Sequence, residues 1–269
     1  MTPRTEPLHA SQALEVSWVR APGDTGFPRH THEEYVLGAN LGGHEQVWLD
    51  GRELQVSPGQ VTLYNPLAVQ GSSFGPEGVE YIALHLAPEA LGRVIAENNL
   101  GSTDRPPSFE QGNLHRPGLF DALVELARSP AHEREQAQLL LYAQLLEQPQ
   151  TAPGEQMPAL AHSVACMRAH PAQRLELDHL AAIAGLSKYH FVRCFKKATG
   201  LGPLQYHMQL RLIEARRRLR RGAHPHDVAL DLGFYDQSHF ITAFRRIHGM
   251  TPRHYSSLHA AGSARMNSR

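Results

Sequence analysis

Two histidines separated by one residue, His30 and His32, are the side chains of this 269-residue chain whose types and spacing most directly suggest chemistry. Side chains two residues apart share one face of a β-strand, so both imidazoles would point the same way, and Glu34 continues the alternation. Imidazole and carboxylate groups bind transition metals and also form hydrogen bonds to small organic ligands. Three interpretations stay open: a metal site, an effector pocket, or hydrogen-bonded histidines in a barrel wall.

A second group of candidate residues is basic and lies in the last hundred residues, where two similar segments recur. Each combines a short helix with apolar periodicity, a turn at glycine (Gly185 and Gly233, 48 residues apart) and a second amphipathic helix with basic residues outward. Two helices joined by a short glycine-containing turn form the unit that places its second helix in the major groove of DNA. Two copies are far more specific than one, and they predict binding to duplex DNA.

The distribution of charge supports this prediction. The formal net charge of the whole chain is zero, yet residues 1–157 contain nine Lys and Arg against 20 Asp and Glu, whereas residues 158–269 contain 17 against six. A basic half joined to an acidic half indicates a nucleic-acid-binding module attached to a module with another task.

Length and cysteine usage favour a cytoplasmic protein with two domains. A chain of 269 residues usually divides into two. We identify neither a signal peptide nor a long apolar run, so we expect the chain not to enter a membrane. The two cysteines, Cys166 and Cys194, are expected to be reduced thiols, with Cys194 a packing residue rather than a redox switch.

The first half is predicted to begin with a small barrel or sandwich of short strands. A polar arm runs to about residue 11. Residues 14–86 then show period-two alternation and turn signals, including the Asp50-Gly51 pair, which favours a two-residue hairpin.

After residue 88 the pattern changes to helices. We expect one at 89–98, a loop at 101–107, a second helix around 119–127 and a third at 132–148. The third has a wide apolar face that must pack on the barrel or on a second subunit; it comprises Leu139, Leu140, Tyr142, Ala143, Leu145 and Leu146. A Pro-rich stretch at 149–158 marks the domain boundary.

The basic half is predicted to be helical throughout. Proline at the first turn suits the helices that begin at Pro203 and Pro225. The expected helices cover 160–169, 175–184, 187–199, 203–221, a segment from 225, 236–248, and a short terminal helix from 251.

The basic half closely resembles the DNA-binding domain of the AraC family over about residues 160–255. The residues that carry the resemblance are the run 187–200, the run 233–240, Tyr206, Arg211, Leu212, Ala215, Leu219, Phe244, Arg245, Arg246, Gly249, Thr251, Pro252 and Tyr255. The resemblance implies two helix-turn-helix units held together by a linking helix, and a role in regulating transcription.

Within this pattern, apolar residues on the inward helix faces are assigned to the core: Leu180, Ile183, Leu186, Phe191, Phe195, Leu232, Phe234, Phe240 and Phe244. Ser187 is a candidate helix N-cap. The resemblance implies base contacts from Tyr189, Val192 and Arg193 in the first unit and from Gln237, Ser238 and Thr242 in the second. Arginine can bind guanine and glutamine adenine with two hydrogen bonds each. Thr242 departs from the family, which often has arginine there.

Five further basic residues are assigned to phosphate contacts, which position a protein on DNA without reading its sequence. They are Lys188, Lys196, Lys197, Arg245 and Arg246.

The first half resembles the cupin-type effector domain of the same regulators, over roughly residues 14–88. The carriers are the runs 27–35, 58–59 and 64–70, and the helices up to 148 are similar to the family's oligomerisation segment. Enzymatic cupins bind metal through two such histidines, a glutamate and a later histidine, whose place is taken here by Gln70. A neutral amide is a poor metal ligand, so we expect no metal or other cofactor. His30, His32, Glu34 and His85 are the candidate effector contacts.

These observations predict an α+β protein of two domains: a small cupin-like β-barrel with a helical pair, then an all-α double helix-turn-helix domain. The expected boundaries are 1–148 for effector binding and dimerisation, 149–158 for a linker, 159–258 for DNA binding and 259–269 for a flexible tail.

The predicted function is a sequence-specific, DNA-binding transcriptional regulator that responds to a small molecule, without catalysis. It would act as a homodimer, and would contact RNA polymerase if it is an activator. One alternative is a metal-dependent cupin enzyme or sensor fused to a DNA-binding domain. Another is a constitutive DNA-binding protein whose barrel only dimerises.

Overall fold

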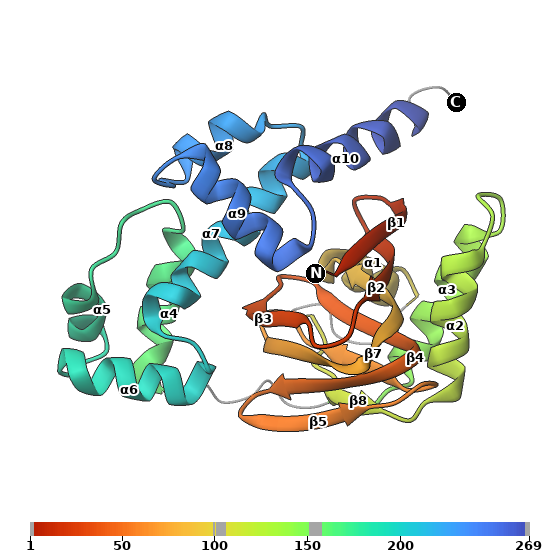
Figure 1. Cartoon of the computed structure of the whole chain (residues 1–269), viewed down its shortest axis with the longest axis horizontal. Coiled ribbons are helices and arrows are strands. Elements are labelled where there is room, and N and C mark those ends of the chain that lie inside the picture. Colours follow the sequence, from red (N-terminus) through yellow and green to blue (C-terminus); the bar gives the residue numbers. More distant parts are fainter. Residues whose placement is uncertain (1–2, 99, 101–105, 151–157, 267–269) are drawn as a thin grey trace. The chain divides into compact units, whose positions relative to one another are not determined.

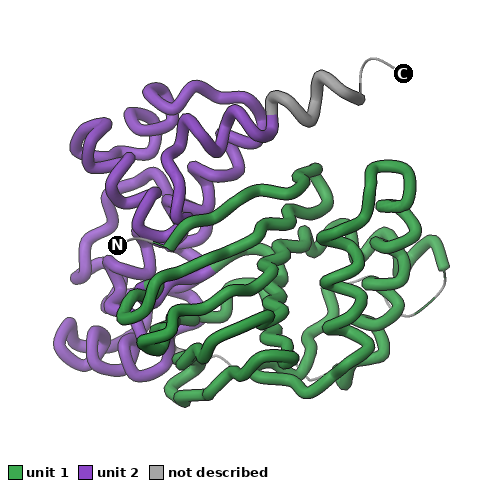
Figure 2. Tube along the Cα trace, turned by 45° about the vertical axis from the view of Figure 1, so that its right-hand side comes forward, with its two compact units in different colours: residues 1–27, 32–153 green, residues 28–31, 154–269 purple. Residues whose placement is uncertain are grey.

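The computed structural model of the chain describes residues 3–98, 100, 106–150 and 158–266. The chain divides into two compact units, residues 1–27 with 32–153 and residues 28–31 with 154–269 (Figure 2). The expected linker and the expected loop after residue 100 fall mostly outside the described residues. No helix in the described part is long and apolar enough to cross a membrane.

The first unit is built around one eight-stranded sheet that forms the cupin-like barrel, as predicted (Figure 1). The strands are β1 (Arg4–Ala10), β2 (Leu14–Ala21), β3 (Gly26–Thr31), β4 (Tyr35–Leu49), β5 (Arg52–Val56), β6 (Val61–Tyr64), β7 (Val69–Leu86) and β8 (Gly112–Leu114). The order is β1-β2-β7-β4-β6-β8, with β3 added to β7 and β5 to β4. The long strands β4 and β7 pair along nearly their whole length, so they form the spine of the barrel.

Local sequence explains the turns. The Asp50-Gly51 pair joins β4 to β5 as expected, and both residues have positive φ (49° and 83°), the conformation that a two-residue hairpin requires. The polar arm predicted before residue 11 is wrong, because these residues form β1. Backbone pairing with β2 holds that strand in place, and backbone pairing does not depend on an apolar side-chain pattern.

A bulge changes which side chains of β4 face the inside of the barrel. The register with β7 slips between Asn40 and Gly42, and the Asn40 side chain accepts a hydrogen bond from the Gly42 amide at 2.9 Å. Before the bulge the inward residues are even-numbered, such as Val36 and Gly38; after it they are odd-numbered, such as Val47 and Leu49. Val36, Val47 and Leu49 accordingly share one apolar cluster.

Helices cover the outer face of the barrel. They are α1 (Pro88–Glu97), α2 (Pro117–Arg128) and α3 (Arg134–Leu146). Leu119, Leu123 and Leu141 share one large core with the outward side chains of the sheet. Only part of the expected apolar face of α3 packs on the barrel: Leu139 and Leu140 are 55% and 44% exposed, while the buried positions are Ala137, Leu141, Tyr142 and Leu145.

Apart from residues 28–31, which belong to β3, the regular structure in the described residues of the second unit is helical, as predicted for the basic half. Its helices are α4 (Pro158–Ala169), α5 (Leu177–Ile183), α6 (Lys188–Thr199), α7 (Pro203–Arg220), α8 (Pro225–Asp231), α9 (Gln237–His248) and α10 (Pro252–Met266). The last is longer than the short helix expected. Of the nine predicted core residues seven are buried, and Ile183 and Leu186 are half-buried.

Candidate nucleic-acid interface and barrel site

The two candidate recognition helices, α6 and α9, are capped in the same way. The Ser187 side chain accepts a hydrogen bond from the His190 amide, as predicted, and Asp236 does the same for the His239 amide at 2.6 Å. Each helix ends at a glycine with positive φ, Gly200 and Gly249. Caps at both ends fix where each helix starts and stops, and therefore which side chains it presents outward.

Both helices bury two phenylalanines and expose a polar face. Phe191 and Phe195 of α6 are fully buried, as are Phe240 and Phe244 of α9. The opposite face of α6 exposes Tyr189 and Arg193, with the Arg193 guanidinium 5.9 Å from the centre of the Tyr189 ring. Val192 is only half-exposed. On α9, the predicted base-reading residues Gln237, Ser238 and Thr242 are all exposed.

Four of the five predicted phosphate partners extend these exposed faces at the last turn of each helix: Lys196, Lys197, Arg245 and Arg246. Lys188 lies at the first turn of α6, and its ammonium group forms an ion pair with Asp178 of α5 at 2.7 Å. That neighbour lies on another helix, so periodicity within α6 could not indicate it.

Tyr235, which sequence reasoning did not select, is 93% exposed in the turn before α9. Its position inside the recurring motif, directly before the Asp236 cap, was the available signal. An aromatic side chain this exposed beside a recognition helix is suited to contact with DNA, because its ring is apolar and its hydroxyl can bind a phosphate.

Arg211 of α7 ties the two helix-turn-helix units together. Its guanidinium donates hydrogen bonds to the carbonyl oxygens of Pro171 and Gln173, before the first unit, and of Gly233, in the turn of the second, at 3.2 to 3.4 Å. It also lies 5.8 Å from the Phe234 ring centre. One side chain therefore joins the segment that leads into the first unit to the turn of the second unit, through backbone atoms.

The predicted effector contacts are all shielded from solvent to some degree; His32, Glu34 and His85 belong to the barrel unit, whereas His30 falls in the segment 28–31 that is grouped with the second unit. His30, His32 and Glu34 are buried, and His85 of β7 is half-buried. The ring centres of His32 and His85 are 4.8 Å apart. The ring of His30 lies 2.6 Å from the Pro28 carbonyl oxygen, and burial lowers the pKa of this imidazole. The structure thus brings His32 and His85 together.

A buried acid that sequence reasoning missed lies inside the barrel. Glu45 is 8% exposed, and burial raises the pKa of its carboxyl from the usual 4.5 to about 7, although a hydrogen bond with Ser72 opposes that shift. Burial and the nearby Glu45 charge also hold the pKa of the Tyr64 and Tyr81 hydroxyls well above 10. Strict alternation along β4 would have pointed Glu45 outward; the bulge turns it inward.

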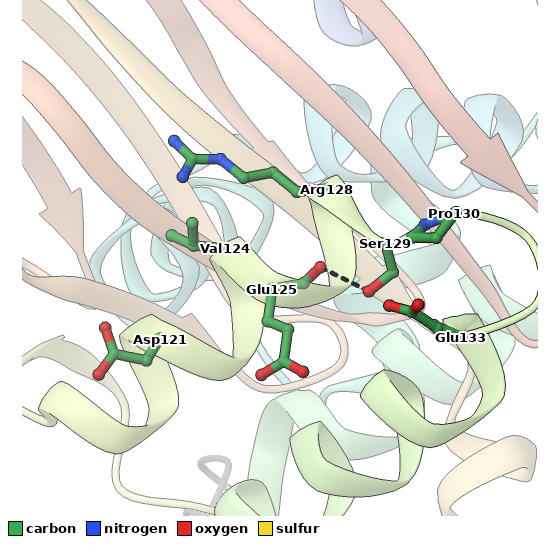
Figure 3. A pocket seen from close by; sticks show the side chains of 7 residues that line it. All are labelled: Asp121, Val124, Glu125, Arg128, Ser129, Pro130 and Glu133. Atoms are coloured by element: carbon green, nitrogen blue, oxygen red, sulfur yellow. Dashed lines mark hydrogen bonds between the residues drawn. The ribbon is translucent and has the colours of Figure 1, made fainter.

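We also searched the described residues for metal-binding clusters and for hollows that could hold a ligand. In the described part of the chain, no three His, Cys, Asp or Glu side chains come together as a metal site. A hollow of about 380 Å³ lies outside the barrel at the turn between α2 and α3, where Ser129 donates to the Glu125 carbonyl (Figure 3). Its lining residues are Asp121, Val124, Glu125, Arg128, Ser129, Pro130 and Glu133, most of them exposed.

A barrel with polar groups in its interior, joined in one chain to tandem capped helix-turn-helix units, defines a class of protein: the ligand-responsive, DNA-binding regulator of transcription. Comparisons with known proteins agree. Residues 19–181 match the AraC-like ligand binding domain model, and residues 180–257 match a helix-turn-helix domain model. The chain therefore belongs to the AraC family of transcriptional regulators.

Individual relatives match large parts of the chain. An uncharacterised transcriptional regulator of Bacillus subtilis, YbfI, is 28% identical over 227 residues, which cover 79% of this chain and 81% of that one. The regulator GbdR of Pseudomonas aeruginosa is 27% identical over 65% of this chain but only 50% of its own length. The crystal structure of ToxT from Vibrio cholerae matches 92% of this chain and 99% of ToxT at a TM-score of 0.56 and 10% identity, a likeness of fold.

Proposed function

We propose that this regulator is a cytoplasmic homodimer that reads a specific duplex site with α6 and α9 and responds, without catalysis, to a small effector held in the barrel. The observation that carries the proposal is the exposed polar face of each capped recognition helix, with basic residues at its end. Gln70, in the place of the later metal-binding histidine of enzymatic cupins, argues against the enzyme alternative.

The dimer would form through the helical pair of residues 1–148. Leu139 and Leu140 are exposed leucines on α3, on the side away from the barrel core, and such residues favour association with a partner. The division into an effector domain (1–148), a linker (149–158), a DNA-binding domain (159–258) and a tail (259–269) remains our proposal. An activator would in addition contact RNA polymerase.

The full-length protein should select a specific site from a pool of random duplexes. Each protomer should protect two successive major-groove segments about one helical turn apart, and the dimer two such half-sites. Affinity should fall steeply with salt, because Lys and Arg side chains displace counterions from phosphates. Footprinting and binding at several salt concentrations provide the measurement; binding that shows no sequence preference would contradict the proposal.

Two variants of α6 should distinguish a residue that contacts bases from one that contacts phosphates. Arg193→Ala should cost about 1–3 kcal/mol on the preferred site and relax the preference at one or two base pairs. Lys197→Ala should weaken binding to all sequences alike and reduce the salt slope by roughly one. Selection on randomised sites with both variants is the measurement, each serving as the other's control. An Arg193→Ala variant with the wild-type preference profile would show that the assignment is wrong.

An organic effector should raise the melting temperature of the barrel, because it binds only the folded state. A screen of sugars, amino acids, small aromatics and fatty acids should find such a compound, and His32→Gln or Glu34→Gln should remove the shift while DNA binding persists. A screen without any shift would favour the interpretation that the barrel only dimerises. Elemental analysis that finds one metal per chain, lost in His30→Ala, would instead favour the metal-dependent alternative.

A further inference from the structure

The strongest unexplained feature of the barrel is the surroundings of the Glu45 carboxyl. Glu45 is more than nine-tenths buried, and its one hydrogen bond given by the structure is with Ser72. Tyr64 of β6 and Tyr81 of β7 are the titratable groups that face it, and both stay neutral at ordinary pH. A buried carboxyl without a cationic partner is costly to ionise, so a protein rarely places one where an apolar side chain would serve.

Aromatic side chains lie on the same face of the sheet as Glu45. Phe74 is the residue directly opposite Glu45 in the β4–β7 ladder, and paired residues in an antiparallel sheet point to the same face. The Phe74 ring centre lies 6.4 Å from that of Tyr81 and 6.1 Å from that of Phe27. Aromatic faces attract cations, most strongly where water is excluded.

The described part of residues 1–157 supplies neither a lysine nor a buried arginine to this place. The first 157 residues contain no lysine, and every arginine there whose side chain the structure describes lies outside the buried class. The ion pairs that Arg20, His44 and His132 form in the barrel unit lie at exposed side chains. Around Glu45 the described residues therefore combine a carboxyl and aromatic side chains without a lysine or arginine.

A second polar group inside the barrel, the Gln70 side-chain amide, lacks a hydrogen-bond partner for its oxygen in the described part of the chain. Gln70 is opposite Leu49 in the β4–β7 ladder, and Leu49 packs in the inner apolar cluster, so the Gln70 amide faces inward. Its Oε1 atom is buried and has no hydrogen-bond partner among the described residues. A buried acceptor of this kind is normally satisfied by a water or by a ligand with a donor.

We propose that the effector of this regulator carries an ammonium group, which binds between Glu45 and the aromatic rings of Phe74 and Tyr81, with Gln70 as a hydrogen-bond acceptor for the rest of the molecule. The inference rests on the proposed effector function of the barrel and names its chemical class. Pairing with an ammonium group satisfies the buried carboxylate, and the rings complete the enclosure of the cation.

The test measures the melting temperature of the full-length protein by tryptophan fluorescence, since Trp18 and Trp48 both lie in the barrel unit. The probes are tetramethylammonium and butylammonium chlorides, with neopentyl alcohol and sodium butyrate as uncharged and anionic counterparts, at matched ionic strength. We expect a saturable rise with an ammonium probe only. Affinity should drop about tenfold per pH unit below 7, where binding must displace the Glu45 proton.

Three variants identify the site. Glu45→Gln keeps the shape of the side chain and should weaken the ammonium response at least tenfold, and Phe74→Leu should weaken it about threefold to fivefold. Glu53→Gln, an exposed acid on β5, should leave it unchanged. An ammonium response that survives in Glu45→Gln, or no response from either ammonium salt, overturns the proposal. The proposal is also overturned if neopentyl alcohol or butyrate raises the melting temperature and the rise persists in Glu45→Gln. In that case the barrel would still bind a small molecule, but not through an ammonium group.

Discussion

Replacing Phe240 by alanine is expected to unfold the second helix-turn-helix unit or bring it close to unfolding. The side chain is fully buried, with ring centres of Phe234 and Phe244 at 4.9 and 5.7 Å. Removing such a ring costs about 3–5 kcal/mol, a large part of the 5–15 kcal/mol that stabilises an ordinary domain. Specific DNA binding should be lost with it, because α9 and its cap depend on that core.

Two signals distinguish the units in this experiment. Helical circular dichroism in urea follows mainly the DNA-binding unit, whereas tryptophan fluorescence follows the barrel, which contains both tryptophans. The Phe240→Ala variant should shift only the first transition. Tyr235→Ala is the matched control: it removes a ring that is 93% exposed and should change stability by no more than about 0.5 kcal/mol. Equal effects of the two substitutions would show that the assigned core is wrong.

Replacing Glu45 by glutamine should make the barrel less sensitive to pH. The pKa of this carboxyl is about 7 in the folded chain against 4.5 for the exposed group, so the folded state holds the proton more tightly than the unfolded state. The wild type should therefore lose stability as pH rises from about 4.5 to 7 and stay level above that range. The loss is on the order of 3 kcal/mol.

The measurement is the difference in unfolding free energy between the wild type and Glu45→Gln at pH 4.5 and pH 8, from urea titrations followed by tryptophan fluorescence. Other groups titrate in both proteins, so the difference isolates the one carboxyl. Between pH 4.5 and pH 8, the unfolding free energy of Glu45→Gln should rise relative to that of the wild type. The exposed Glu53→Gln substitution should show no such gain. A constant difference for Glu45→Gln would mean that the carboxyl titrates as if exposed.

Sequence patterns predicted the helical unit well because its signals are local. Ser187, Gly200 and the spaced phenylalanines specify where each helix begins, ends and packs within a dozen residues. The Asp50-Gly51 hairpin was predictable for the same reason. The resemblance to a known family then supplied a prediction that local patterns could not, namely which outward residues contact DNA.

The features that the sequence did not predict depend on contacts with residues far away in the chain. The strand β1 is held by backbone pairing with β2, which leaves little trace in a polar sequence. Three consecutive leucines, Leu139 to Leu141, give no indication of which one is buried; contact with the barrel core selects Leu141. Glu45 faces inward only because a bulge earlier in β4 shifts the alternation, and a bulge is defined by its register with β7, not by local pattern alone.

The hydrogen bonds of Arg211 have a consequence for the DNA site that the protein binds. The Arg211 guanidinium joins the backbone ahead of the first unit to the turn of the second. This contact restrains the distance and the angle between α6 and α9. One inserted base pair rotates one half of a binding site against the other by about 35°. If α6 and α9 keep a fixed separation on DNA, we expect binding to weaken when one base pair is inserted between the two segments of the site that they contact.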